Sequence, residues 1–185
     1  SGILVSGEFG YLALINCFNI TVWGVKVGGS GEGLLLVNTN GSLIFNSTFL
    51  YSDYGIRSIS SHGNTIAGIL VKNVSIGISL ESTTLTTVTG CKIYNAREWG
   101  IMVLRSAYNT IIMNEISNVG GGTVIYESST TLLEANSLDS CSNLGVLIVR
   151  SRGNIIRGNT IRTRGEAFKG ETEGNNICHN VIMGA

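Results

Sequence analysis

Side chains that could carry out acid–base chemistry are few in this chain and scattered along it. There are two aspartates, Asp53 and Asp139, and 86 residues separate them. Glycoside hydrolysis normally needs two carboxyl groups a few ångströms apart, and this spacing does not predict such a pair. We consider His62 the first candidate for a catalytic base, with Arg57 and Glu81 as its candidate neighbours. No motif connects the three, so the sequence favours a chain that is not a complete enzyme.

The cysteines and histidines do not indicate a metal site. None of the cysteines is in a C-x-x-C motif, and His62 and His179 are 117 residues apart. Isolated cysteines are ordinary small core side chains. We therefore expect neither a metal nor a cofactor, and we expect these thiols to lie in or near the core: Cys17, Cys91, Cys141 and Cys178.

A repeat of 21 to 23 residues sets the position of all these side chains. If the first residue of each copy is position zero, positions 11 and 16 are apolar in all eight copies, and positions 1 and 3 are apolar in most. Separate short apolar stretches of this kind are typical of strands. The repeat predicts three short strands per coil, each stacked about 4.8 Å from its equivalent in the next coil. The copies begin at Tyr11, Gly33, Gly55, Gly77, Gly100, Gly122, Gly145 and Glu166.

Polar residues also recur at fixed positions. We expect the asparagines at positions 9 and 14 to lie at corners of the coil, where asparagine accepts left-handed backbone angles and its amide can bond from coil to coil. Position 5 alternates in charge along four coils, which predicts ion pairs between coils. The asparagines are Asn64, Asn109, Asn154 and Asn175 at position 9 and Asn114, Asn136, Asn159 and Asn180 at position 14, and the charged residues are Arg105, Glu127, Arg150 and Glu171.

The motif N-x-I-x-x-N-x-I, as in NTIIMNEI and NIIRGNTI, resembles the repeats of the right-handed parallel β-helix superfamily. That superfamily includes pectate-lyase-like enzymes and phage tailspikes. The resemblance covers nearly the whole chain and implies an all-β, right-handed parallel β-helix solenoid of about eight coils, with residues 1–185 as one domain. We expect this domain to be an excerpt or module of a larger chain or assembly. Because the scaffold hosts many activities, the resemblance implies the fold more than the function.

The outward side of the first strand in each coil is unusually apolar. Positions 2 and 4 should point away from the core, yet they carry large apolar side chains in four copies. A strand that is apolar on both sides is normally covered on both sides, and a contiguous apolar surface marks an interface. We therefore expect self-association, for instance as a trimer, or packing of a neighbouring domain, through Leu35, Val37, Met102, Leu104, Val124, Tyr126, Leu147 and Val149.

Composition narrows the range of partners. Basic and acidic residues number 12 each, so no overall field attracts nucleic acid or an anionic membrane. The longest apolar runs have about five residues, far fewer than a membrane-spanning helix needs. Proline is absent, which suits a backbone held mostly in β ladders. We expect neither a nucleic acid nor a membrane as partner.

The leading hypothesis from the sequence is a structural or glycan-binding β-helical module of an extracellular or viral assembly, such as a tailspike, fibre or appendage. We expect it outside the cell or on a virion surface. The alternative is a carbohydrate-active enzyme, a polysaccharide lyase, hydrolase or epimerase, that acts on an outer sheet. A polysaccharide is a candidate ligand in both cases. Four N-x-[ST] sequons would carry glycans only in a secreted protein, and they are at Asn19, Asn40, Asn46 and Asn73.

Overall fold

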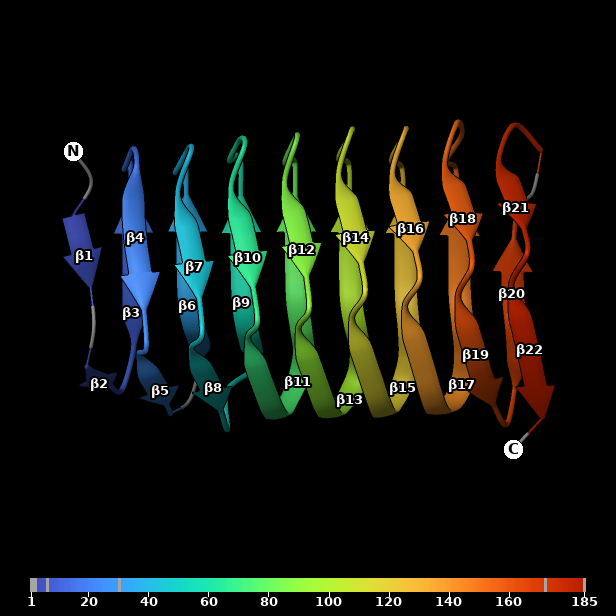
Figure 1. Cartoon of the computed structure of the whole chain (residues 1–185), viewed down its shortest axis with the longest axis horizontal. Coiled ribbons are helices and arrows are strands. Elements are labelled where there is room, and N and C mark those ends of the chain that lie inside the picture. Colours follow the sequence, from blue (N-terminus) through green and yellow to red (C-terminus); the bar gives the residue numbers. More distant parts are fainter. Residues whose placement is uncertain (1–2, 6, 30, 172, 185) are drawn as a thin grey trace.

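The protein is a β-solenoid in a computed structural model that describes residues 3–5, 7–29, 31–171 and 173–184. Figure 1 shows the coils side by side along the long axis, with the two ends of the chain at opposite ends of the molecule. Neighbouring coils pair through parallel strands. The described residues form strands and turns, and none of them forms a helix that is long and apolar enough to cross a membrane. The expectation of an all-β parallel solenoid is confirmed.

One sheet consists of the second strand of each coil, and we call it the short-strand sheet. Within the described residues it has nine strands, which stack in chain order along the axis. They are β1 (Ile3–Val5), β4 (Ile20–Trp23), β7 (Leu43–Phe45), β10 (Thr65–Ala67), β12 (Thr87–Thr89), β14 (Thr110–Ile112), β16 (Leu132–Glu134), β18 (Ile155–Arg157) and β21 (Asn176–Cys178).

The second sheet has 13 strands in the described part of the chain and contains two stacks. The third-strand stack includes β2 (Glu8–Phe9), β5 (Lys26–Gly28), β8 (Thr48–Leu50), β19 (Thr160–Thr163) and β22 (Val181–Gly184). The first-strand stack includes β3 (Leu12–Ile15), β6 (Glu32–Val37), β9 (Tyr54–Ile59) and β20 (Glu166–Gly170). Four long strands belong to both stacks: β11 (Leu70–Glu81), β13 (Lys92–Leu104), β15 (Glu115–Tyr126) and β17 (Ser137–Val149).

The long strands differ from the expected three separate strands per coil. In them the third strand of one coil continues into the first strand of the next, and the register shifts at the corner, for example between Val74 and Ile76. The backbones of neighbouring coils approach closely at this irregular corner: a Cβ added at Gly120 would lie 2.5 Å from the carbonyl oxygen of Arg97. Three separate strands per coil are found only towards the two ends.

The core fills the space between the three stacks. The residues at repeat positions 11 and 16 are fully buried from the first to the seventh coil, as in Ile44 and Phe49. The glycine that begins six of the eight copies is needed because its inward side is already occupied: a Cβ at Gly77 would lie 2.6 Å from Cγ2 of Ile93. The apolar positions of the repeat are therefore the positions whose side chains pack in the core.

The asparagine ladders lie inside the corners. Asn136 is buried, and its Oδ1 accepts bonds from the backbone N–H of Asn114 and from that residue's side chain, both over 2.9 Å. The expectation that these asparagines have left-handed backbone angles is wrong: the left-handed residue is the one before, such as Met113 with φ 55°. The buried asparagine amide forms hydrogen bonds with backbone groups of the turn. The exposed residue before it adopts the left-handed angle that bends the chain.

Candidate functional site

Arg57 and Glu81 lie next to each other on the outer side of the first-strand stack, in β9 and β11. Nε of Arg57 donates to Oε1 of Glu81 over 2.9 Å, and Nη2 donates to Oε2 over 3.1 Å. The register explains this contact, because it pairs Arg57 with Ser79 and Ile59 with Glu81. Stacking of successive coils thus joins two side chains that are 24 residues apart in the sequence.

His62 does not join this pair through any bond in the described residues. Its Nδ1 is 2.8 Å from Oγ1 of Thr84, and its backbone N–H donates to Oδ1 of Asn40 over 2.8 Å. The chain turns at Ser60, which has a φ of 49°, and so separates His62 from β9. The side chain of His62 is exposed at the corner, in a stack with its equivalents from neighbouring coils.

Three further residues complete a cluster around Arg57. Nη1 of Arg57 donates to Oε1 of Glu32 over 3.3 Å, and its Cζ lies 4.8 Å from the centroid of the Tyr54 ring. The hydroxyl of Ser79 donates to Oε1 of Glu81 over 3.0 Å. We call these five residues the Arg57 cluster: Glu32, Tyr54, Arg57, Ser79 and Glu81.

Sequence reasoning missed three members of this cluster. Glu32 and Tyr54 come immediately before the glycine that begins a copy, a position at which the copies share no residue type. Ser79 is at repeat position 2, where most copies have an apolar residue. Arg57 occupies the same position in the preceding copy. The available signal was that polar residues replace apolar ones at repeat position 2 in these two copies.

Arg57 and Glu81 hold each other in the charged form. The hydrogen bond to Glu81 raises the pKa of Arg57 above its ordinary value. Burial alone would raise the pKa of Glu81, but hydrogen bonds from Arg57 and Ser79 outweigh this effect and hold the pKa below its ordinary value. Since the side chain of Glu81 is only 12% exposed, it is a shielded carboxylate at neutral pH. Such a group accepts hydrogen bonds but does not serve as a general acid.

The cluster is suited to binding hydroxyl groups. Carboxylate oxygens accept hydrogen bonds from hydroxyls, a guanidinium donates to them, and a tyrosine ring offers an apolar surface for C–H groups. The described residues offer no cluster of ligands for a metal ion, because no three His, Cys, Asp or Glu side chains among them come together. Burial raises the pKa of the Cys91 thiol to about 11 and that of Cys141 to about 12, which makes both poor ligands and nucleophiles at neutral pH.

The apolar side chains predicted to form an interface lie on the same outer side of the first-strand stack. The register pairs Leu35 with Arg57 and Ser79 with Met102, so the Arg57 cluster interrupts an apolar column. Val124 is buried, and the other seven of these side chains are half-buried because their neighbours along the axis cover them. The apolar surface is therefore less exposed than the sequence pattern suggests.

The charged residues at position 5 form one ion pair in the described residues. Nη1 of Arg150 lies 3.0 Å from Oε1 of Glu127, and Nη1 also donates to the Tyr126 hydroxyl over 3.3 Å. Arg105 and Glu171 form no ion pair with their neighbours in this part of the chain.

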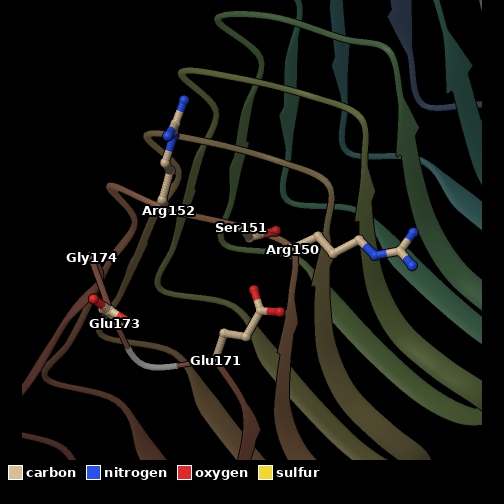
Figure 2. A pocket seen from close by; sticks show the side chains of 6 residues that line it. All are labelled: Arg150, Ser151, Arg152, Glu171, Glu173 and Gly174. Carbon is tan, nitrogen blue, oxygen red and sulfur yellow. The ribbon is translucent and has the colours of Figure 1, made fainter.

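A cavity adjoins Arg150 at the corner between the last two coils. In Figure 2 the side chains of Arg150 and Arg152 point away from each other, and the carboxylate of Glu171 points toward the segment that carries Arg150 and Ser151. Two glutamates and two arginines line the cavity, so their formal charges cancel and no net charge would select a ligand. Its lining residues are Arg150, Ser151, Arg152, Glu171, Glu173 and Gly174.

Comparison with known proteins identifies the fold family. The family model described as "Right handed beta helix region" matches residues 33–185. This match agrees with the parallel pairing and adds the right-handed sense of the coil. No curated protein sequence matches the chain.

Several solved structures share this fold. DFA-IIIase from Arthrobacter chlorophenolicus A6 has a TM-score of 0.77 at 11% identity, over 92% of this chain and 50% of that one. The periplasmic alginate epimerase AlgG has a TM-score of 0.69 at 21% identity, over 84% and 40%. The A-module of the Azotobacter vinelandii mannuronan C-5 epimerase AlgE4 has a TM-score of 0.54 at 14% identity, over 91% and 61%. This chain thus spans about half the length of these structures, and identities this low show a common fold alone.

Proposed function

This chain belongs to the right-handed beta helix family, and from that premise we propose that it is a glycan-binding module that works outside the cytoplasm. The glycan lies on the outer side of the first-strand stack and contacts the Arg57 cluster. The fold supports this proposal because the similar solved structures are named as carbohydrate-active proteins, and one of them is periplasmic. Cell fractionation tests the location, and a cytoplasmic protein would contradict it.

The Arg57 cluster is the observation that carries the proposal. Apolar residues precede and follow it along the same column. Replacing a partly buried ion pair by packed apolar side chains is often neutral or stabilising, so stability alone gives little reason for charges here. Binding gives one, because the cluster presents carboxylates, a guanidinium and an aromatic ring on one surface.

A panel of neutral and acidic polysaccharides tests the proposal by affinity electrophoresis and calorimetry. We expect wild type to bind at least one of them and Arg57→Gln to bind it about tenfold more weakly, as loss of a charge-assisted bond implies. Arg157→Gln is the matched control, since Arg157 pairs with Glu134 over 2.9 Å on the short-strand sheet. Its effect should stay within about twofold. If folded wild type binds nothing, or if both variants weaken binding equally, the proposal is wrong.

A second candidate function, a carbohydrate-active enzyme, is supported by the names of the similar structures, which include two epimerases. Its first catalytic candidates are His62, Glu81 and Arg57. Incubation of the chain with neutral and uronic-acid polysaccharides, followed by NMR of the products, separates the two functions. A binding module leaves the polymers unchanged. Cleavage or epimerisation that is lost in Glu81→Gln or His62→Ala would replace the binding proposal.

Self-association through the apolar part of the same outer surface is compatible with glycan binding, because Met102, Val124 and Leu147 lie in coils beyond the Arg57 cluster. Light scattering at tens of micromolar should show an oligomer that Leu147→Lys dissociates. The matched control is Ile155→Lys on the short-strand sheet, which should leave the oligomer intact. A wild-type monomer at these concentrations would exclude the interface.

A further inference from the structure

A second polar surface lies along the corner where the long strands bend, at the lower edge of Figure 1. Two cavities, of about 440 Å³ and about 370 Å³, share Arg97 as a lining residue. Together they form what we call the corner groove, whose main polar residues are Asp53, Asn73, Asn95, Arg97, Asn118 and Arg164. Asp53 directly precedes Tyr54, so the groove borders the Arg57 cluster.

Two arginines in the corner groove have no acidic partner among the described residues. Nη2 of Arg97 donates to the Ser75 hydroxyl over 2.5 Å, and the Arg164 side chain makes no bond in this part of the chain. Some other arginines of the protein do form ion pairs, such as Arg157, whose Nε lies 2.9 Å from Oε1 of Glu134. Among the described residues no carboxylate lines the 370 Å³ cavity, which contains both Arg97 and Arg164. The carboxylate of Asp139, which accepts a bond from Ser140 beside the cavity, is paired with Arg162. The cavity therefore presents positive charge that an anionic ligand could neutralise.

Neutral hydrogen-bonding groups lie between the two arginines. Asn118, Ser140 and Ser142 line the cavity, and its floor is apolar, with Val119 only 3% exposed. The Asn118 amide makes no hydrogen bond to any described residue. In the neighbouring cavity Asn95 donates to Oδ1 of Asn73 over 2.9 Å, which leaves its own carbonyl oxygen available. An apolar floor with a few convergent polar groups is typical of a ligand site.

The spacing of the arginines indicates an extended ligand. Arg97 and Arg164 belong to coils that are three steps apart, so their backbones are about 14 Å apart at about 4.8 Å per coil. A ligand that lies along the axis over this distance can contact both residues. The rise per coil is close to the length of one sugar unit in an extended chain, so a polysaccharide parallel to the solenoid axis can repeat its contacts from coil to coil.

We propose that the corner groove binds an acidic polysaccharide, with acidic groups at Arg97 and Arg164 and hydroxyls at Asn118, Ser140 and Ser142. The choice of a glycan rests on the proposed function, whereas the negative charge follows from the two arginines. Single-stranded nucleic acid fits less well, because such ligands stack on several aromatic side chains, and of the described residues that line the two cavities Tyr51 alone is aromatic.

Calorimetry with a polygalacturonate oligomer and its carboxyl-reduced, neutral counterpart tests this site. We expect wild type to bind the acidic oligomer about tenfold or more tightly than the neutral one, and added salt to weaken that binding. The double variant Arg97→Gln/Arg164→Gln should lose about tenfold or more in affinity. The charge-matched control Arg152→Gln/Arg157→Gln, on other surfaces, should lose no more than about twofold. Thermal unfolding of all variants checks that they fold.

The outcomes separate this inference from the proposed function. If polysaccharides bind but the Arg97→Gln/Arg164→Gln variant binds the acidic oligomer as wild type does, the corner groove is not the site, while the glycan-binding proposal stands. Equal affinity for the acidic and neutral oligomers also overturns the inference. Equal or tighter binding of poly-glutamate or single-stranded DNA overturns the choice of a glycan. If no polysaccharide binds folded wild type, both proposals fall.

Discussion

The indole ring of Trp99 lies over the bare backbone of Gly121 in the next coil. The register pairs these two residues in β13 and β15. A Cβ added at Gly121 would collide with Cζ3 and Cε3 of the indole and would lie 2.8 Å from its Cη2. The missing side chain of Gly121 therefore provides the space in which the Trp99 ring lies, on the outer side of the first-strand stack beside the Arg57 cluster.

Gly121→Ala should displace the Trp99 ring. We expect a red shift in Trp99 fluorescence, measured in a Trp23→Phe background, because the displaced ring is more exposed to water. Overpacking of this kind costs about 1–3 kcal/mol, so the midpoint of thermal unfolding should fall by about 2 °C or more. Gly28→Ala is the control, because a Cβ there has its nearest neighbour at 3.6 Å. An unchanged emission spectrum in Gly121→Ala would show that the ring does not rest on the glycine.

Asn136→Ala should destabilise the protein strongly. Its Oδ1 accepts from the backbone and side chain of Asn114, and its Nδ2 donates to the carbonyl oxygen of Ile111 over 2.9 Å. Each buried group left without a partner costs about 1–3 kcal/mol, so we expect the free energy of unfolding to fall by about 2–5 kcal/mol in urea titrations. Asn143→Ala, which removes an exposed amide at an ordinary backbone angle, should change it by about 0.5 kcal/mol or less. Similar losses in both variants would contradict the role of the buried ladder.

The ion pair of Glu81 should make stability depend on pH in the acidic range. The pKa of Glu81 in the folded protein lies below the ordinary value of 4.5. A carboxyl group of this kind stabilises the fold above its unfolded pKa, and the contribution is lost as pH falls through the folded pKa. The difference in unfolding free energy between wild type and Glu81→Gln should therefore be constant above about pH 5 and shrink below about pH 4.5. A difference that stays constant down to about pH 3 would contradict the lowered pKa.

The buried thiols of Cys91 and Cys141 should resist labelling in the native protein. Both side chains are fully buried, and burial raises their pKa values to about 11 and about 12. At pH 8 very little thiolate is present, and the reagent has no access to it. We expect a disulfide reagent to label the half-buried Cys17 and Cys178 first, and Cys91 and Cys141 only after unfolding. Mass spectrometry identifies the labelled sites, and rapid native labelling of Cys91 would show that the core opens.

The coil could be predicted from the sequence because one pattern repeats through every copy. The side chains of Ile44 and Phe49 are buried where positions 11 and 16 place them. The continuous strands across the corner could not be predicted, because they depend on close backbone approach at residues such as Gly120. The left-handed residue of each turn was expected one position too late, at Asn114 in place of Met113.

The candidate site was predictable only in part. Arg57 and Glu81 were selected for their chemistry, and the register brings them together. Glu32 and Tyr54 were missed because their position in the repeat carries no constant residue type. Arg97 was missed for a different reason: what distinguishes it is that its hydrogen bond goes to Ser75 and not to a carboxylate, and a sequence pattern does not reveal this.

The most direct test of glycan binding is a crystal structure of the chain with an oligosaccharide that the binding panel selects. We expect sugar rings on the outer side of the first-strand stack, with hydroxyl groups within hydrogen-bonding distance of Glu81 or Arg57. Electron density for the sugar on the short-strand sheet, with the Arg57 cluster unoccupied, would contradict the proposed site.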